Sequence, residues 1–231
     1  MGKYFKYAIG EIILVVAGIL IALQINNWNE NRKQELQSQQ YVNAIISELH
    51  FDLYNLKVFD SFSKVYAESI KNYLDYYGLE ERNNAVLLQK MDSIQSIKNV
   101  YYSAAYTIDD LISSGNLNLL SGQNKREILF YKNQFDQAVI YIQNSNNDLV
   151  KAEENFYNSI DRLYYEGLAP SEHSEVKGWK QNLNSKPMRL FNNMQYTAYD
   201  THKYHTVLYG NLIRNLEKQL IPTLKNEQSN R

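Results

Sequence analysis

The stretch IILVVAGILIAL, residues 12–23, contains no polar side chain, and apolar character extends outward from it to Tyr7 and Trp28. As a helix rising about 1.5 Å per residue, the segment from Tyr7 to Trp28 is roughly 33 Å long. This length is close to the hydrocarbon thickness of a bilayer, about 30 Å, and aromatic side chains at both ends are typical of membrane interfaces. The sequence therefore predicts an N-terminal membrane anchor, residues 1–30, with one transmembrane helix.

A cleaved signal peptide is the competing interpretation of this segment, because such a peptide is also short, apolar and preceded by lysines. The residues after Leu23 read QINNWNENRKQE and are bulky and polar. A signal peptidase site needs small residues in an A-x-A-like arrangement at this point. We therefore expect the helix to be retained as an anchor.

The charges beside the anchor bear on its orientation, although they nearly balance. Lys3 and Lys6 precede the apolar segment, and Arg32 and Lys33 follow it. A short N-terminal tail with two lysines and a free amine favours a cytoplasmic N-terminus. We predict a single-pass protein of the inner membrane of a Gram-negative cell, with the C-terminal domain in the periplasm.

One face of the predicted anchor has a distinct composition. Gly18 and Ala22 form a small-xxx-small pair that permits close helix approach, and Glu11 is a carboxylate that needs a partner inside an apolar segment. We predict that this face, with the lipid bilayer around it, mediates self-association or docking to another membrane protein. Alternatively, Glu11 lies at headgroup level beside Lys6, and the small residues have no partner. Three- and four-residue steps define this membrane-association face as Glu11, Leu14, Gly18, Ala22 and Ile25.

The rest of the chain has the composition of a helical domain. The 231 residues are 44% hydrophobic, enough for one core of ordinary size, and 9 glycines with 3 prolines are too few turn signals for a many-stranded barrel. The 24 basic and 25 acidic residues nearly balance, which argues against a nucleic-acid partner, and the absence of cysteine excludes disulfides and thiolate sites. We predict an all-α fold: the transmembrane helix, an antiparallel helical bundle with long helices over residues 31–222, and a disordered tail over residues 223–231.

Punctuating residues divide the bundle into helices. Glycine and proline are absent between Ile19 and Tyr77, which predicts one long helix that continues from the membrane segment towards Gly78. A second long helix is predicted from Gln123 to Gly167, and a last one from Pro187 until Pro222 ends it. Between the first two we predict a short helix with Asn83 or Asn84 as N-cap and apolar positions Leu87, Leu88, Met91, Ile94 and Ile97, and a brief helix ended by Gly115.

Few residues suggest chemistry. The chain has no G-x-S-x-G, phosphate-binding glycine loop or HExxH motif, so we predict no catalytic residues, no metal and no cofactor. His202 and His205 have a spacing that allows a metal site, but His205 lies on an apolar stripe, which favours a core histidine. A possible ligand-binding corner combines carboxylates, hydroxyls and a cap glycine, although an ordinary capped helix end is the favoured explanation. Its residues are Asp109, Asp110, Ser113, Ser114 and Asn116.

Two motifs resemble a known family. KYAIGEIILVVAGILIALQINNWNENRK, residues 6–33, and YTIDDLISSGNLNLL, residues 106–120, are similar to a domain-of-unknown-function family, number 6090, from flavobacteria-related Gram-negative bacteria. Its members carry nearly this anchor and a later aspartate-x-leucine-x-serine-serine-glycine-asparagine corner. The resemblance covers the anchor strongly and the rest loosely. It implies a single-pass protein with a helical domain, and no activity.

These observations favour a non-enzymatic protein of the cell envelope. We expect the periplasmic helical domain to act as a scaffold or a partner-binding module. Two alternatives remain open: a ligand-binding sensor domain that acts through a partner, and a membrane-anchored enzyme of unknown reaction.

Overall fold

The computed structural model describes residues 2–160, 179–180 and 182–229. Within these ranges every regular element is a helix, which confirms the predicted all-α fold. The elements are α1 (Gly2–Tyr77), α2 (Asn84–Asp92), α3 (Tyr106–Ser113), the 3₁₀ helix η1 (Asn116–Leu119), α4 (Gly122–Tyr157), α7 (Lys186–Asn215), the π-helix η2 (Leu216–Leu220) and α8 (Ile221–Ser229).

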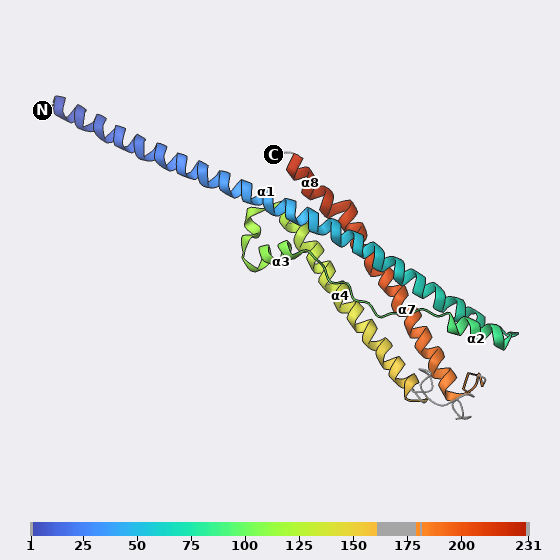
Figure 1. Cartoon of the computed structure of the whole chain (residues 1–231). Coiled ribbons are helices and arrows are strands. Elements are labelled where there is room, and N and C mark those ends of the chain that lie inside the picture. The colour runs from blue at the N-terminus through green and yellow to red at the C-terminus, as the bar shows by residue number, and fades with distance from the viewer. Residues whose placement is uncertain (1, 161–178, 181, 230–231) are drawn as a thin grey trace.

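Helix α1 is one uninterrupted rod, as predicted from the lack of glycine and proline in most of its length. Its C-terminal part packs in the bundle, and its N-terminal part projects from the bundle without contacting another element (Figure 1). The first residues of α1 that are buried follow Leu36. The predicted anchor is therefore continuous with the longest helix of the bundle.

Helix α7 lies between α1 and α4 in the packing and runs antiparallel to both (Figure 1). Its start meets the end of α1, where Tyr73 donates a hydrogen bond to Asn192 at 2.5 Å. Farther along, Asn215 donates to Gln134 of α4 at 2.9 Å. Helices α1 and α4 consequently run in the same direction. An extended segment of the chain lies alongside both of them.

The extended segment consists of residues 93–105, and we call it the strap. It returns the chain from α2 to α3 and contacts α1 at Ser69, where the Gln95 backbone N–H donates to the serine hydroxyl. On the other side, Asn146 of α4 donates to the carbonyl of Asn99 at 3.4 Å. The strap therefore connects α1 and α4 through its own polar groups.

Ile94 and Ile97 lie on the strap, so the prediction that they belong to a helix is wrong. The segment is not helical because it must span a long distance between its two contacts with α1. Gln95 lies beside Ser69 and Thr107 beside Glu48, so the segment must cover the length of 21 helical residues, about 32 Å. A helix from 95 to 107 would reach only about 18 Å, whereas an extended chain covers the distance with ease.

Other predicted boundaries agree with the structure. Asn83 caps α2, and its side chain accepts from the N–H groups of Ala85 and Val86. Gly115 ends the α3 turn with a φ of 74°, and Pro187 lies in the first turn of α7. Helix α4, by contrast, ends at Tyr157 with Asn158 as its C-cap, before the predicted end at Gly167. Residues 161–167 of the prediction lie outside the described residues.

The helix does not end at Pro222, contrary to the prediction. The π-helix η2 precedes the proline, and the Ile221 N–H bonds the Leu216 carbonyl five residues back. A proline inside a regular helix clashes with the carbonyl four residues earlier, and the wider π turn relieves this clash. The chain then continues as α8, where Leu224 is fully buried.

The core has two adjoining parts. The first contains α3, α8 and the nearer parts of the long helices, with Ile45, Leu56, Ile128 and Leu216 at its centre. The second lies at the opposite end of the bundle from the projecting rod, and Tyr73, Phe156, Trp179 and Phe191 form its aromatic centre. Helices α1, α4 and α7 contribute to both parts, so the long helices join the two.

Candidate functional site

The projecting part of α1 is the most unusual surface of the described chain. Its large apolar side chains from Ile9 to Trp28 are 43% to 75% exposed. No other helix among the described residues is long and apolar enough to cross a membrane, and none of the apolar window is buried within the fold. Exposed apolar surface of this extent is typical of a segment covered by something outside the chain.

The predicted membrane-association face lies within this segment. Leu14 and Ile25 are 75% and 61% exposed, and a Cβ added at Gly18 would meet nothing within 4 Å. The face therefore makes no contact with the rest of the chain. Whether another helix packs on it stays a prediction.

The possible ligand-binding corner adopts the structure of a capped helix end. The hydroxyls of Ser113 and Ser114 both donate to the carbonyl of Asp110, at 3.2 and 2.7 Å. Asp109 points to α4, where its carboxylate lies 3.4 Å from Lys132. Asn116 begins η1. The hydroxyls therefore serve the local turn, and the five predicted residues do not converge on one point.

Asp110 does border a shallow hollow of about 520 Å³ between α1 and α3. Gln37, Gln40 and Tyr41 form its α1 wall, and Tyr106 and Thr107 lie on the other side. Helix α3, which lines the hollow, lies on the part of the bundle nearest the projecting rod (Figure 1). The walls of the hollow offer amide, hydroxyl and carboxylate groups to a partner.

The carboxylate of Asp52 is a polar centre that the sequence reading missed. It is fully buried in the first part of the core. Three groups of the strap donate to it: the hydroxyl of Tyr101 at 2.6 Å, the backbone N–H of Ala104 at 2.7 Å and the hydroxyl of Ser103. Burial and the nearby carboxylate raise the pKa of Tyr101, so its hydroxyl stays a donor.

Glu48, one turn before Asp52, also accepts hydrogen bonds from a residue outside α1. Its carboxylate accepts from the backbone N–H of Thr107 at 3.0 Å and from the Thr107 hydroxyl at 2.8 Å. Helix α3 has no side-chain cap of its own, so α1 supplies the cap from outside. A pair of acids four residues apart, among the apolar residues Ile45, Leu49 and Leu56, was the available signal.

His202 and His205 are core histidines. Each ring Nε2 lies within hydrogen-bond distance of a serine hydroxyl: Ser96 of the strap at 2.9 Å for His202, and Ser145 of α4 at 2.8 Å for His205. Burial lowers the pKa of each imidazole to about 4. In the described part of the chain no three His, Cys, Asp or Glu side chains cluster as metal ligands. The geometry supports a structural role for both rings.

A second hollow, of about 300 Å³, lies at the far end of the bundle between α2, the strap, α4 and α7. Met91, Leu149 and Phe191 line its inner wall, and Gln195 adds a buried side chain whose Oε1 has no hydrogen-bond partner. Sequence reasoning did not identify this site, because its residues come from four separate elements. The hollow combines this apolar inner wall with the charged side chains of Asp92, Glu153 and Lys180 and with the free acceptor of Gln195.

Comparison with known proteins identifies a family that this chain matches. A family model described as "Family of unknown function (DUF6090)" matches residues 11–161, which is more than half of the chain. The match includes the apolar segment, α3 and the whole of α4. Neither the curated proteins nor the solved structures contain a match to this chain.

Proposed function

Because the chain belongs to this family of unknown function, DUF6090, we propose its role from physical features alone: it is a single-pass inner-membrane protein whose helical domain binds a partner without catalysing a reaction. The N-terminus lies in the cytoplasm, and the bundle lies in the periplasm. The observation that carries this proposal is the exposed apolar part of α1. Without a lipid or protein cover this surface would be exposed to water.

Energetics support a membrane in preference to water. Removing apolar surface from water is worth about 25 cal/mol per Å², and the segment carries large aliphatic side chains all around the helix. A helix that is apolar on every side fits lipid, whereas a helix that packs on one soluble partner needs only one apolar face. Trp28, with Arg32 5.8 Å from its ring, lies where the segment becomes polar and suits the membrane interface.

The continuity of α1 supports retention of the segment. Residues 24–35 are helical and lie in the middle of a rod that extends into the core. Cleavage after a signal sequence would cut this helix between the apolar segment and Val42, the first large apolar residue of α1 that is buried. We infer that the rod is an anchor and a spacer at once.

Membrane fractionation tests the anchorage. The full chain should stay in the membrane pellet after alkaline carbonate extraction, and mass spectrometry should find its N-terminus intact. Leu20→Arg should reduce insertion, because a charge near the bilayer centre costs about 3 kcal/mol. The matched control, Leu36→Arg, lies on the same helix outside the apolar segment and should leave insertion unchanged. Recovery of a soluble protein shortened at its N-terminus would overturn the proposal.

Cysteine labelling tests the orientation, because the chain has no cysteine of its own. A membrane-impermeant maleimide should label Asp148→Cys on α4 from the periplasmic side of intact cells. Lys3→Cys should react only after the cells are lysed. The reverse pattern would show that the bundle is cytoplasmic.

A second candidate function, ligand sensing, is favoured by the free acceptor of Gln195 in the hollow of about 300 Å³. Native mass spectrometry of the protein purified from membranes should then detect a bound small molecule. Ala198→Phe, which fills the hollow from α7, should abolish it. If the wild-type protein carries no molecule, this candidate is wrong.

A further inference from the structure

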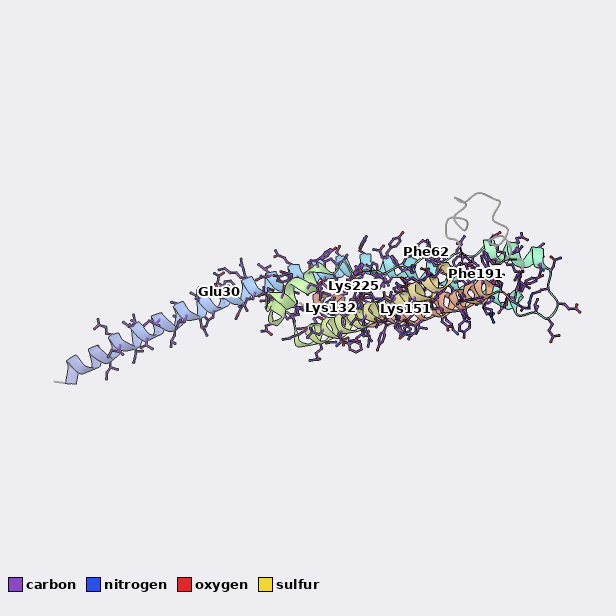
Figure 2. The ribbon with its side chains drawn as sticks, turned by 90° about the horizontal axis from the view of Figure 1, so that it is seen from below. Glu30, Phe62, Lys132, Lys151, Phe191 and Lys225 are labelled. Atoms are coloured by element: carbon purple, nitrogen blue, oxygen red, sulfur yellow. The ribbon has the colours of Figure 1, made fainter. Side chains whose placement is uncertain are left out.

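Helix α1 carries an exposed apolar stripe within the bundle, distinct from its projecting part. The stripe consists of Phe51, Tyr54, Val58, Phe62 and Val65, which follow one another in steps of three and four residues. Phe51 and Tyr54 are 58% and 67% exposed, and Phe62 lies near the edge of the bundle (Figure 2). Val58 is half-buried, and the fold leaves the other four apolar side chains of the stripe exposed.

The stripe is separate from the face of α1 that forms the core. The buried residues Asp52, Leu56 and Ile70 point to the strap and the other helices, whereas the stripe lies to one side of them. No charged residue lies within the stripe, and the nearby Lys64 pairs with Asp60 at 2.6 Å. Two copies of the stripe, which does not include Glu11, could therefore meet without placing like charges together.

The stripe lies on the same side of α1 as the membrane-association face, and polar residues that include Asn29, Gln40 and Ser47 separate the two. Gly18 and Tyr54 are 36 residues apart, as are Ala22 and Val58, and this spacing is about ten full turns at 3.6 residues per turn. Helix α1 has no break between these positions. The small residues of the apolar segment and the aromatic stripe of the bundle thus face the same direction.

We propose that this side of α1, with the membrane-association face near one end and the stripe near the other, is the interface with a second copy of the chain, arranged in parallel around a two-fold axis. The inference rests on the proposed membrane anchorage, which holds all copies in one orientation and at one height. Two identical rods in the same bilayer then bring Gly18 against Gly18 and Phe62 against Phe62. A symmetric pair is also the commonest arrangement of self-associating proteins, with the same patch on both subunits.

A second copy fits this face better than an unrelated protein does. An unrelated partner would need an apolar membrane helix and an apolar extramembrane surface with the same separation and the same helical phase. A second copy meets these conditions by identity. Close approach at Gly18 and Ala22 brings the rods together in the lipid, and the stripe buries aromatic surface outside it.

Single-cysteine crosslinking in native membranes tests the proposal, again using the cysteine-free background. With a short bifunctional maleimide, Phe62→Cys and Tyr54→Cys should give a crosslinked dimer as the main product. The control Lys64→Cys lies two residues from Phe62, at the same height but about 200° around the helix, and should give at least fivefold less dimer. Equal crosslinking of Phe62→Cys and Lys64→Cys, or none at either, would overturn the proposal.

Helical phase gives a sharper test of continuity. In the Phe62→Cys chain, two alanines inserted after Asn31 rotate the stripe by about 200° relative to Gly18, whereas seven alanines rotate it by only about 20°. We expect the two-residue insertion to reduce the dimer at least fivefold and the seven-residue insertion to preserve it. Equal crosslinking of the two insertions would show that the two halves of the face do not act together.

A substitution in the apolar segment of α1 tests whether the membrane-association face contributes to the same interface as the stripe. Gly18→Leu should lower crosslinking at Phe62→Cys, and Ala17→Leu, about 100° away around the helix, should not. Circular dichroism of each purified variant should match the unsubstituted chain, since all these positions are exposed. A chain that resists carbonate extraction but fails to crosslink refutes the dimer alone, whereas a chain lost from the membrane refutes the anchorage.

Discussion

At the scale of single residues, buried polar groups hold the strap in the bundle. Asp52 accepts three hydrogen bonds from the strap, and His202 and His205 connect α7 to Ser96 and Ser145. A buried polar group that loses its partner costs much more than the net gain of the bond it made. The contacts of Asp52 and His202 therefore specify where the strap lies, and the contact of His205 joins α7 to α4.

Asp52→Ala should lower the free energy of unfolding by about 3 kcal/mol, because it leaves the Tyr101 hydroxyl and the Ala104 N–H buried without an acceptor. Chemical denaturation of the full chain in detergent, followed by circular dichroism, measures the change. Asp148→Ala, which removes an exposed ion pair with Lys151, should cost less than about 0.5 kcal/mol. Similar losses in both variants would contradict the role assigned to Asp52.

The two core histidines should make stability depend on pH. Burial lowers the pKa of His202 and His205 to about 4, below their unfolded value near 6.5, so both are neutral in the fold. The stabilisation is complete above about pH 6.5 and is lost as pH falls towards 4, because the unfolded chain takes up protons first. The midpoint of denaturation should therefore drop between pH 6.5 and pH 5.

Substitutions identify the groups responsible for that drop. His205→Gln should flatten the pH dependence in this window, whereas His50→Gln, at an exposed position of α1, should leave it unchanged. An unaltered slope in His205→Gln would exclude this histidine as a cause.

At the scale of elements, short turns and caps set where the helices stop. Gly115 adopts a left-handed conformation between α3 and η1, and Glu48 caps α3 from a neighbouring helix. The π turn before Pro222 allows the last helix to continue and to bury Leu224. Each boundary thus has a local cause, except that of α3, whose cap comes from elsewhere in the fold.

Gly115→Ala should destabilise the protein by about 1 kcal/mol, because its φ of 74° strains any residue with a Cβ. No atom lies within 4 Å of the added Cβ, so crowding does not contribute. Gly210→Ala, in the interior of α7 and equally uncrowded, should stabilise it by roughly 1 kcal/mol through helix propensity. Thermal denaturation should show a lower midpoint for Gly115→Ala and a higher midpoint for Gly210→Ala. A lower midpoint in both variants would refute this explanation.

At the scale of the whole molecule, three long helices and the strap form one bundle on a projecting rod (Figures 1 and 2). The two parts of the core share α1, α4 and α7, so we expect them to unfold together. Helix α1 connects the apolar segment to the bundle without a break. Its residues between the two hold the bundle at a fixed distance from the end of the apolar segment.

Leu224→Ala tests this coupling, because Leu224 and Trp179 belong to opposite parts of the core. A cavity at a buried leucine costs roughly 3 kcal/mol. In a Trp28→Phe background, the denaturation midpoint reported by Trp179 fluorescence should fall together with that reported by circular dichroism. The exposed control Leu36→Ala should change neither. Two separated transitions would show that the core parts unfold independently.

Sequence alone determined the elements whose causes are local. The apolar run, the absence of glycine and proline from most of α1, and the caps at Asn83, Gly115 and Pro187 act over a few residues, so they are readable from the chain. The family was also recognisable, because its motifs are contiguous. The tertiary structure decided what depends on distance: the strap is extended because a helix would be too short, and Asp52, Glu48 and Gln195 acquire their roles from groups brought near by folding. The alignment of the membrane-association face with the stripe depends on both, since the sequence spacing sets their phase and only an unbroken helix preserves it.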